Sequence, residues 1–355
     1  MKVAIWGSYN YGNYGDDVMA IMISQHLQKL GVTPYVYRLN RKLSEQYNVN
    51  TTDSLQELFK GSKFCVVGGG TVLLEPLYGS IGSAMNEDIR QLWEITNTEK
   101  CPLFCISIGG DGTEVTNRKL TLYQWRLLES ELFRGGTVRL QQDVELFEKI
   151  GKKISLFPDI VLSLNSFWQT EQKSNTPQEP LHVGLCLSKT PDTRKFAYLL
   201  NQIASLRRQA IFHFVHPHQS DNNLTNFSLL PPKSPWIQHH FYQDPATTIQ
   251  FISTLDLLIS SYMHPNITAL AASVPIYSLD SRAKTIAVME SLSIKFASYP
   301  LGKRSLFKLL MQLSSKKSIL EVRDRFEFEK IEQVKMLAQG HFQYLTRLVE
   351  EFSEQ

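Results

Sequence analysis

Short apolar runs alternate with longer segments of helical periodicity along most of the chain, and this alternation limits the possible folds more than any other feature. Val3–Trp6 predicts a buried strand, and Val18–Leu30 has the spacing of an amphipathic helix. The run FCVVGGG is apolar at consecutive positions before its glycines, which is typical of a parallel strand covered on both faces. Further strands are expected at Tyr35–Leu39, Pro102–Gly109, Thr137–Leu140 and Ile154–Phe157, and then in the runs HVGLCLS, AIFHFVH, LDLLISS and VPIYSLD. The pattern predicts an α/β protein with two doubly wound, Rossmann-like domains.

The length of 355 residues also favours two domains, because a single hydrophobic core rarely grows to that size. The polar stretch TEQKSNTPQEP is typical of a linker. We therefore expect an N-terminal domain at 1–170, a linker at 171–180, a C-terminal domain at 181–310 and a C-terminal helical segment at 311–355. Apolar residues of this segment predict one face of a long helix that packs back onto the body and is interrupted at Gly340, namely Ile331, Val334, Leu337, Phe342, Leu345 and Val349.

The composition is that of an ordinary globular chain, with 43% hydrophobic residues, 20% charged residues and a formal net charge of +3. That charge is too small to indicate a nucleic-acid partner or an acidic membrane, although it is compatible with a local basic patch. The four cysteines lack the spacing of a zinc site, and three lie in apolar runs, which favours free buried thiols in a reducing, cytoplasmic setting. We expect neither a signal peptide nor a transmembrane segment.

The loop GSYNYGNYGDD follows the first predicted strand and leads into the first predicted helix. It does not have the GxGxxG spacing of a dinucleotide site. Gly12 and Gly15 permit tight turns, and free backbone N–H groups at a helix start suit an anion. Asp16 or Asp17 is also placed to cap the helix, and capping alone would explain that aspartate.

Two more glycine-rich loops follow predicted strands of the same domain. Gly68, Gly69 and Gly70 carry an entropy cost on folding, so a ligand that approaches this backbone closely is one explanation and a crowded contact between domains is the other. Gly109–Thr113, in SIGGDGT, is either a second such loop or a simple turn. Strand ends are where doubly wound sheets bind ligands.

In the second domain, Ser260, Ser261 and His264 follow a predicted strand. A helix is expected at Asn266–Ala272, with Asn266 at the end that points into the cleft between the domains. An imidazole with an ordinary pKa of about 6.5 donates or accepts a proton at physiological pH, so His264 is a candidate acid or base. A purely structural histidine is the alternative.

A metal site is the other chemistry that histidine spacing suggests here. His216, His218 and Asp221 follow a neighbouring strand, and His-x-His pairs occur in metal sites. No matching cluster occurs elsewhere, nor does a G-x-S-x-G elbow, a Walker loop or a CxxC pair. We therefore expect no metal.

Taken in order, these stretches resemble the polysaccharide pyruvyl transferase family. The family's opening loop, G-x-x-G-x-N-x-GD, has its counterpart in Gly12, Asn13, Gly15 and Asp16. The other counterparts are the GGG loop at Gly68–Gly70, the G-x-G strand end near Ile108–Gly110, the V-R-D segment at Val138–Gly151, the aspartate at Asp159, the S-x-R-x-H signature at Ser260–His264, the A-L-A-x-x-x-P segment at Ala269–Pro275, and a lysine at Lys284. The resemblance covers about Met1 to Lys284.

The resemblance implies a fold like that of the two-domain GT-B glycosyltransferases. It implies that a pyruvyl group moves from phosphoenolpyruvate to a pair of sugar hydroxyls as a ketal, with release of phosphate. Phosphoenolpyruvate is then a co-substrate, no cofactor is needed, and the partners are a small-molecule donor and a sugar or glycan acceptor, soluble or lipid-linked.

The resemblance also implies roles for individual residues. His264, with Asp16 or Asp159 as its carboxylate partner, would be catalytic. Arg139 and Lys284 would hold the donor's anionic groups. The glycine loops, Ser260, Ser261 and the helix start near Asn266 would complete the binding site, partly through their amides.

Two positions depart from the family pattern. Tyr262 stands where the family has an arginine, and Leu140 stands where it has the aspartate of V-R-D. Loss of that arginine removes a charge suited to carboxylate or phosphate, which Arg139, Arg282, Lys284 or loop amides would have to replace. Two alternatives therefore stay open, a glycosyltransferase that uses a nucleotide-sugar and a non-catalytic or regulatory homologue.

Overall fold

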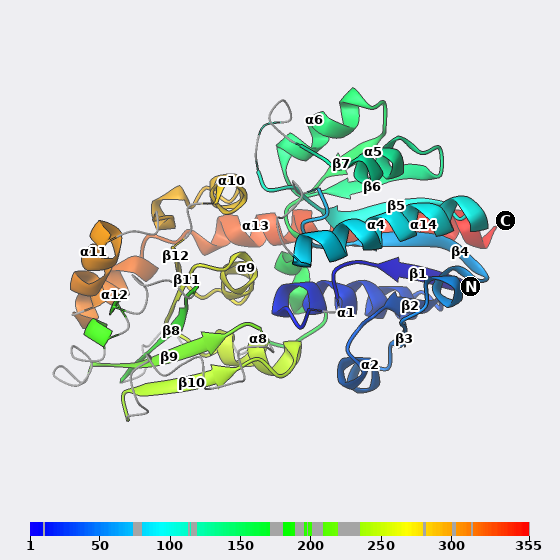
Figure 1. The fold of residues 1–355 in the computed structure, drawn as a ribbon. Helices are drawn as coiled ribbons and strands as arrows, with labels where there is room; N and C mark the ends of the chain where they lie inside the picture. The colour runs from blue at the N-terminus through cyan, green and yellow to red at the C-terminus, as the bar shows by residue number, and fades with distance from the viewer. Residues whose placement is uncertain are drawn as a thin grey trace. The chain divides into compact units, whose positions relative to one another are not determined.

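The computed structural model describes residues 1–9, 11–73, 80–112, 114, 119–170, 180–188, 195–196, 198–200, 209–218, 235–279, 282–299, 303–313 and 315–354. The chain forms two compact units. One contains Met1–Ile160 together with Met336–Gln355, and the other contains Val161–Lys335 (Figure 1). Apart from Pro180, the linker expected at 171–180 lies outside the described residues.

A parallel seven-stranded sheet forms the centre of the first unit, in the order β3-β2-β1-β4-β5-β6-β7. Its strands are β1 Lys2–Trp6, β2 Thr33–Tyr37, β3 Asn50–Thr52, β4 Ser62–Gly68, β5 Leu103–Ile108, β6 Phe133–Val138 and β7 Ile154–Leu156. The central strands β4 and β5 are buried almost throughout, as their apolar runs predict. The short edge strand β3 was not expected, because NTT has no apolar residue.

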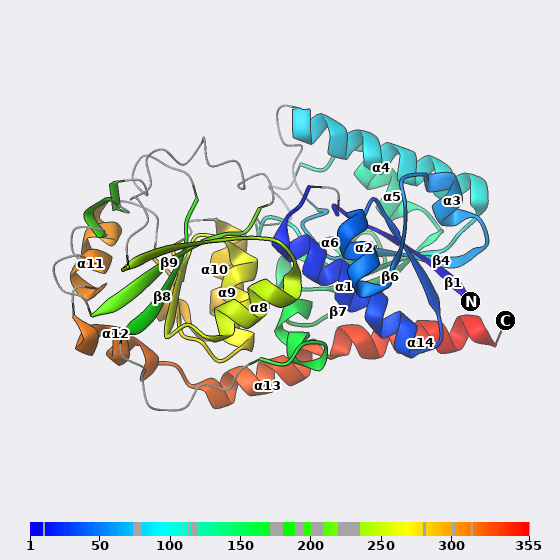
Figure 2. The ribbon, with the colours of Figure 1, turned by 90° about the horizontal axis from the view of Figure 1, so that it is seen from below.

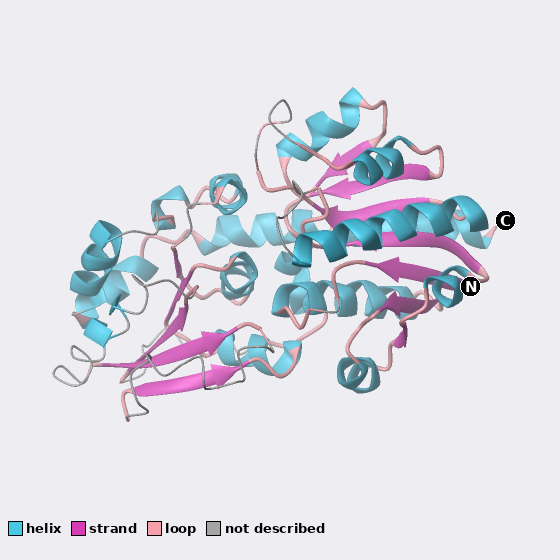
Figure 3. Cartoon of the chain, viewed as in Figure 1, coloured by secondary structure: helices cyan, strands magenta, loops and turns pink. Residues whose placement is uncertain are grey.

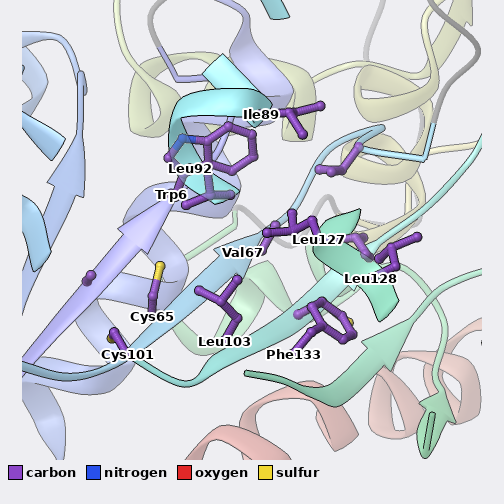
Figure 4. Close-up of a cluster of buried hydrophobic side chains, with 14 of the residues drawn as sticks. Trp6, Cys65, Val67, Ile89, Leu92, Cys101, Leu103, Leu127, Leu128 and Phe133 are labelled. Atoms are coloured by element: carbon purple, nitrogen blue, oxygen red, sulfur yellow. The ribbon is translucent and has the colours of Figure 1, made fainter. Parts of the chain in front are cut away.

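Helices cover this sheet, as Figure 3 shows. They are α1 Tyr14–Lys29, α2 Arg41–Tyr47, α3 Leu55–Phe59, α4 Ser80–Glu99, α5 Leu122–Glu129, α6 Gln141–Lys149 and α14 Gly340–Ser353. On one face, side chains of the strands and of α3–α6 form a single hydrophobic cluster that includes Trp6, Val67, Leu92 and Phe133 (Figure 4). Helices α1 and α14 lie side by side, with the His26 and Phe342 rings 4.8 Å apart (Figure 2).

Helix α1 begins at Tyr14, one turn before the predicted start at Val18. Asn13 is its N-cap and accepts a hydrogen bond from the Gly15 amide through Oδ1 at 3.3 Å. The expectation that Asp16 or Asp17 caps the helix was therefore wrong. Both aspartates lie in the first turn, where a negative charge still interacts favourably with the helix dipole.

The second unit has a parallel five-stranded sheet in the order β10-β9-β8-β11-β12. Its strands are β8 Leu181–Cys186, β9 Ala210–His216, β10 Ile237–Phe241, β11 Leu257–Ser260 and β12 Ile276–Ser278, and its helices include α8 Pro245–Ser253, α9 Met263–Ala271, α10 Ala283–Ser291, α11 Lys303–Leu313 and α12 Lys316–Arg323. The predicted α/β class with parallel sheets in two domains is confirmed. The edge strand β10 was not expected, because two histidines interrupt its apolar pattern.

Helix α9 begins at Met263 instead of the predicted Asn266. Pro265 therefore lies in the first turn, where its missing N–H costs no intrahelical hydrogen bond. His264 consequently lies inside the helix and not before it.

The end of the C-terminal segment, from Met336, packs back on the first unit, and the predicted interruption at Gly340 is confirmed. Helix α13 spans Phe328–Ala338, and α14 begins at Gly340. The break occurs where Gly340 packs on the Phe157 ring, since a Cβ at this position would overlap that ring. Leu337, which was predicted to lie on the buried face, is 60% exposed. None of the helices that the structure describes is long and apolar enough to cross a membrane.

His341 fixes α14 to the sheet. Its Nδ1 lies 2.7 Å from Thr137 Oγ1 and its Nε2 lies 2.8 Å from the Pro158 carbonyl oxygen. Burial lowers the pKa of His341 to about 4. The imidazole is therefore neutral at physiological pH.

This pKa predicts an acid-sensitive stability. Between pH 6.5 and about 4 the unfolded chain binds a proton at His341 that the folded chain does not, so the free energy of unfolding falls as the pH falls. We expect a loss of about 2 kcal/mol from this group between pH 7 and pH 5. Urea unfolding of the wild type and of His341→Gln at both pH values measures it, because the variant lacks this part of the loss. Equal losses in the two proteins would contradict the assignment.

Candidate functional site

The loops that follow β1 and β4 are joined at the carboxyl edge of the first sheet. Tyr9, buried in the first loop, donates a hydrogen bond from its hydroxyl to the Gly68 carbonyl oxygen. Burial and the nearby Asp16 carboxylate raise the pKa of Tyr9 well above its ordinary value, so the hydroxyl keeps its proton and remains a donor.

The GGG loop packs directly on the first two turns of α1. Gly69 and Gly70 have φ of +68° and +76°, which side-chain-bearing residues rarely adopt. A Cβ at Gly69 would lie 2.7 Å from the Met19 sulfur, and a Cβ at Gly70 would lie 3.2 Å from Asp16 Oδ1. These glycines therefore allow the backbone of the loop to lie close to side chains of α1 in the same unit.

Asp16 lies at the junction of these two loops. Its Oδ2 accepts a hydrogen bond from Asn13 Nδ2 at 2.8 Å, and its exposed fraction is 9%. Gly12, one residue before Asn13, has a positive φ and closes the turn. Gly15 lies in the first turn and is buried. The predicted residues of the opening loop are thus brought together around one carboxylate.

Arg139 and Asp159 form a buried ion pair. Arg139 Nη1 lies 2.8 Å from Asp159 Oδ2, and the two side chains are 1% and 0% exposed. Arg139 Nη2 also lies 3.4 Å from Thr71 Oγ1, which joins the pair to the end of the GGG loop. The sequence predicts that Arg139 holds the donor and that Asp159 is catalytic, and the structure pairs the two with each other.

The loop after β5 is tied to its neighbours in the same way. The Gly109 amide donates to the Gly70 carbonyl at 3.1 Å, and the Gly110 amide donates to both carboxylate oxygens of Asp143 at 3.1 and 3.2 Å. Leu140, at the N-cap of α6, is buried and makes no side-chain cap. Asp143, three residues after Leu140, supplies a carboxylate in the first turn of the same helix.

In the second unit, the polar residues that follow β11 hold a turn. Tyr262 N donates to Ser260 Oγ at 2.9 Å, and Ser188 N donates to Ser261 Oγ at 2.6 Å. Asn266 Nδ2 donates to Ser278 Oγ at 3.1 Å. Ser260, Ser261 and Asn266 are buried, so these side chains join the ends of β8, β11 and β12 to the start of α9.

His264 and Tyr262 flank this turn and are only partly buried. The Tyr262 ring contacts the His218 ring edge to face, with centroids 5.4 Å apart. Arg282, the exposed N-cap residue of α10, donates from Nη2 to the Ser261 carbonyl oxygen at 2.8 Å. A guanidinium group therefore lies beside the backbone that carries Tyr262. Lys284 is partly buried in the first turn of α10.

Within the described residues, no group of three His, Cys, Asp or Glu side chains is arranged to hold a metal ion. His216 Nε2 lies 3.3 Å from His239 Nδ1, on the adjacent strand, and His218 contacts Tyr262. Asp221, the third member of the possible metal set, lies outside the described residues.

The predicted residues gather at two sheet edges, one in each unit, at the carboxyl ends of the strands. Two residues that matter to the first edge had no role assigned from the sequence. Asp143 lies three positions after Leu140, where the family motif has its aspartate. His341 comes from the C-terminal segment. The signal in the sequence for Asp143 is its place in the acidic first turn of α6. For His341 the signal is the glycine break directly before it.

A protein-family model matches most of the chain. The family model described as polysaccharide pyruvyl transferase matches residues 13–282. A search of curated proteins finds no match.

Similar solved structures extend over nearly the whole chain. The UDP-GlcNAc 2-epimerase from Neisseria meningitidis bound to UDP-GlcNAc has a TM-score of 0.60 at 10% identity, covering 96% of this chain and 99% of its own. MnaA of S. aureus, solved with UDP, has a TM-score of 0.62 at 7% identity, covering 94% of both chains. The glycotransferase of kitacinnamycin has a TM-score of 0.57 at 10% identity, covering 99% and 98%. At such identities the likeness shows the fold alone, which is of the GT-B type.

The buried ion pair makes a specific prediction about stability. Asp159→Asn removes the carboxylate charge that lies 2.8 Å from the buried Arg139 guanidinium, and we expect a loss of roughly 3–5 kcal/mol in the free energy of unfolding, measured by urea denaturation. The double variant Arg139→Met, Asp159→Leu removes both charges and should recover most of that loss. A single variant as stable as the wild type would show that the pair is dispensable for folding.

Proposed function

The chain belongs to the polysaccharide pyruvyl transferase family, and from this premise we propose that it transfers a pyruvyl group from phosphoenolpyruvate to two hydroxyls of a sugar. In the net reaction, two C–O bonds form between donor C2 and the two hydroxyl oxygens, and the C2–O bond to phosphate breaks. One hydroxyl proton goes to the methylene carbon, which becomes a methyl group, and the other leaves with phosphate. The product is a cyclic ketal.

The position of His264 is the observation that carries the proposal. This imidazole lies in the first turn of α9, at the carboxyl edge of the sheet, and is only partly buried. The neighbouring Ser260 and Ser261 are buried in the turn. We infer that His264 exchanges a proton with a ligand at this edge, as acid toward the donor methylene or as base toward a sugar hydroxyl, and its partial exposure supports this role.

In the first unit, Asp16 is the carboxylate that best fits a role toward substrate. It retains some exposure, whereas Asp159 is enclosed with Arg139. We infer that Arg139 and Asp159 position the loops after β4, β6 and β7, and that amides of the α1 start are the donors that this edge offers to an anionic group.

A nucleotide-sugar glycosyltransferase is the second candidate, because the similar solved structures include a glycotransferase and proteins solved with UDP or UDP-GlcNAc. The two reactions release different products. Incubation with phosphoenolpyruvate and candidate acceptors should release inorganic phosphate, whereas a glycosyltransferase would release a nucleoside diphosphate from a nucleotide-sugar. A non-catalytic homologue would release neither.

Replacement of His264 tests its proposed role. General acid–base help is worth about 10²–10⁴ in rate, so His264→Ala should lower kcat by at least a hundredfold. Phosphate release measures this loss, with the melting temperature as the check on folding. His239→Ala, on the edge strand β10 of the same sheet, is the matched histidine control and should retain activity. A near-wild-type rate in His264→Ala would remove this residue from the mechanism.

Arg282 is the residue that we expect to replace the charge missing at Tyr262. Its guanidinium bonds the Ser261 carbonyl, one residue from Tyr262. A charge-assisted hydrogen bond contributes about 1.5–3 kcal/mol, so Arg282→Ala should raise KM for phosphoenolpyruvate roughly 10- to 100-fold.

A second variant tests whether the positive charge of Arg282 is what lowers KM. Tyr262→Arg on the Arg282→Ala background should restore much of the affinity, because it returns a guanidinium to the same turn. Lys295→Ala, which removes an exposed cation from the same unit, should leave KM unchanged. Failure of Tyr262→Arg to restore any affinity would show that Arg282 acts otherwise than through this charge.

A further inference from the structure

Helix α11 has apolar side chains on its outward face as well as on its inward one. The inward side chains are buried in the second unit, namely Leu306, Leu309, Leu310 and Leu313. On the opposite face, Phe307 and Met311 are 65% and 60% exposed. Arg304 and Lys308, also exposed, share that face at the spacing i, i+3, i+4, i+7. Two cations therefore alternate with two large apolar side chains on one outward stripe.

Positive charge is concentrated in this part of the chain. Residues 303–325, which include α11 and α12, contain seven Lys and Arg against two acidic residues. The excess of five is larger than the net charge of +3 of the whole chain, so the remainder is net negative. Lys308 also lies 5.5 Å from the centroid of the Tyr299 ring, which holds its stem along the helix surface.

Helix α12, which follows α11, lies away from the candidate site of its own unit. The Lys316 amide, at the start of α12, donates to the side chain of Gln209 at 3.2 Å. Gln209 immediately precedes β9, so α12 adjoins the amino edge of the sheet. His264 follows β11 at the carboxyl edge. None of Arg304, Phe307, Lys308 and Met311 belongs to the candidate site, so substitutions at these positions leave its residues unchanged.

We propose that the outward face of α11 binds the surface of an anionic phospholipid bilayer. A preformed helix that lies in a bilayer interface inserts its apolar side chains between headgroups while its cations meet lipid phosphates. Arg304, Phe307, Lys308 and Met311 have this arrangement. A stable protein–protein interface instead needs an extended apolar centre depleted of lysine, which two side chains bracketed by cations do not form. The inference does not depend on the reaction proposed above.

Vesicle binding by the full chain tests the proposal. We expect the protein to sediment with vesicles of equal parts phosphatidylcholine and phosphatidylglycerol at low salt, and to remain in the supernatant with phosphatidylcholine alone or at high salt. Each cation near such a surface contributes about fivefold to the partition coefficient, so Arg304→Gln with Lys308→Gln should lower it roughly twentyfold. Phe307→Ser with Met311→Ser should lower it at least about tenfold.

Matched controls separate this surface from general charge and apolarity. Arg41→Gln with Lys42→Gln removes two exposed cations from α2, and Met336→Ser with Leu337→Ser removes two exposed apolar side chains from α13. Both controls should bind vesicles as the wild type does. The four substituted side chains of α11 are exposed, so an unchanged melting temperature is expected.

Three results would overturn the proposal. They are no binding of the wild type to the anionic vesicles at low salt, an equal loss of binding in the controls, and unchanged binding in both α11 variants. Sedimentation velocity measures the oligomeric state as a further part of the experiment. A wild-type dimer that becomes monomeric with Phe307→Ser and Met311→Ser, without vesicle binding, would identify the face as a contact between copies of the chain.

Discussion

The close approach of backbone to side chains at the carboxyl edge of the first sheet is the constraint on which the candidate site depends. Gly69 and Gly70 turn with positive φ against Met19 and Asp16, and a Cβ at Gly69 would overlap the Met19 side chain down to its Cβ. The Gly70 carbonyl then accepts the Gly109 amide. The loops after β1, β4 and β5 are thus one hydrogen-bonded layer, and the position of Asp16 follows from that layer.

Charge is handled differently at the two edges. In the first unit, Arg139 and Asp159 neutralise each other in a dry environment, where a lone charge would be costly. In the second unit, Arg282 and His264 retain exposure at the turn before α9. The charged groups of the first edge are therefore enclosed within the protein, whereas those of the second edge are accessible to solvent.

Much of the fold could be predicted from the sequence, because its strands are apolar runs that end in glycine or serine. The two strands not expected, β3 and β10, are edge strands whose side chains are polar or histidine and so carry no such signal. Helix starts were misplaced by about one turn, since α1 and α9 begin with residues whose apolar periodicity is weak. The sequence predicted which residues lie at the two sheet edges, but not which side chains they contact. Nothing in the spacing of Arg139 and Asp159 shows that they bond to each other, because that contact depends on the order of β6 and β7 in the sheet.

Helix α14 has a consequence for how the chain is made. The first unit takes its last helix from residues 340–353, and His341 and Gly340 of that helix contact residues that end the N-terminal half. During synthesis the seven strands of this unit emerge first, and the whole second unit follows before α14 does. One side of the first sheet therefore stays incompletely covered while some 180 residues are synthesised. Its apolar face needs protection from aggregation until translation is nearly finished.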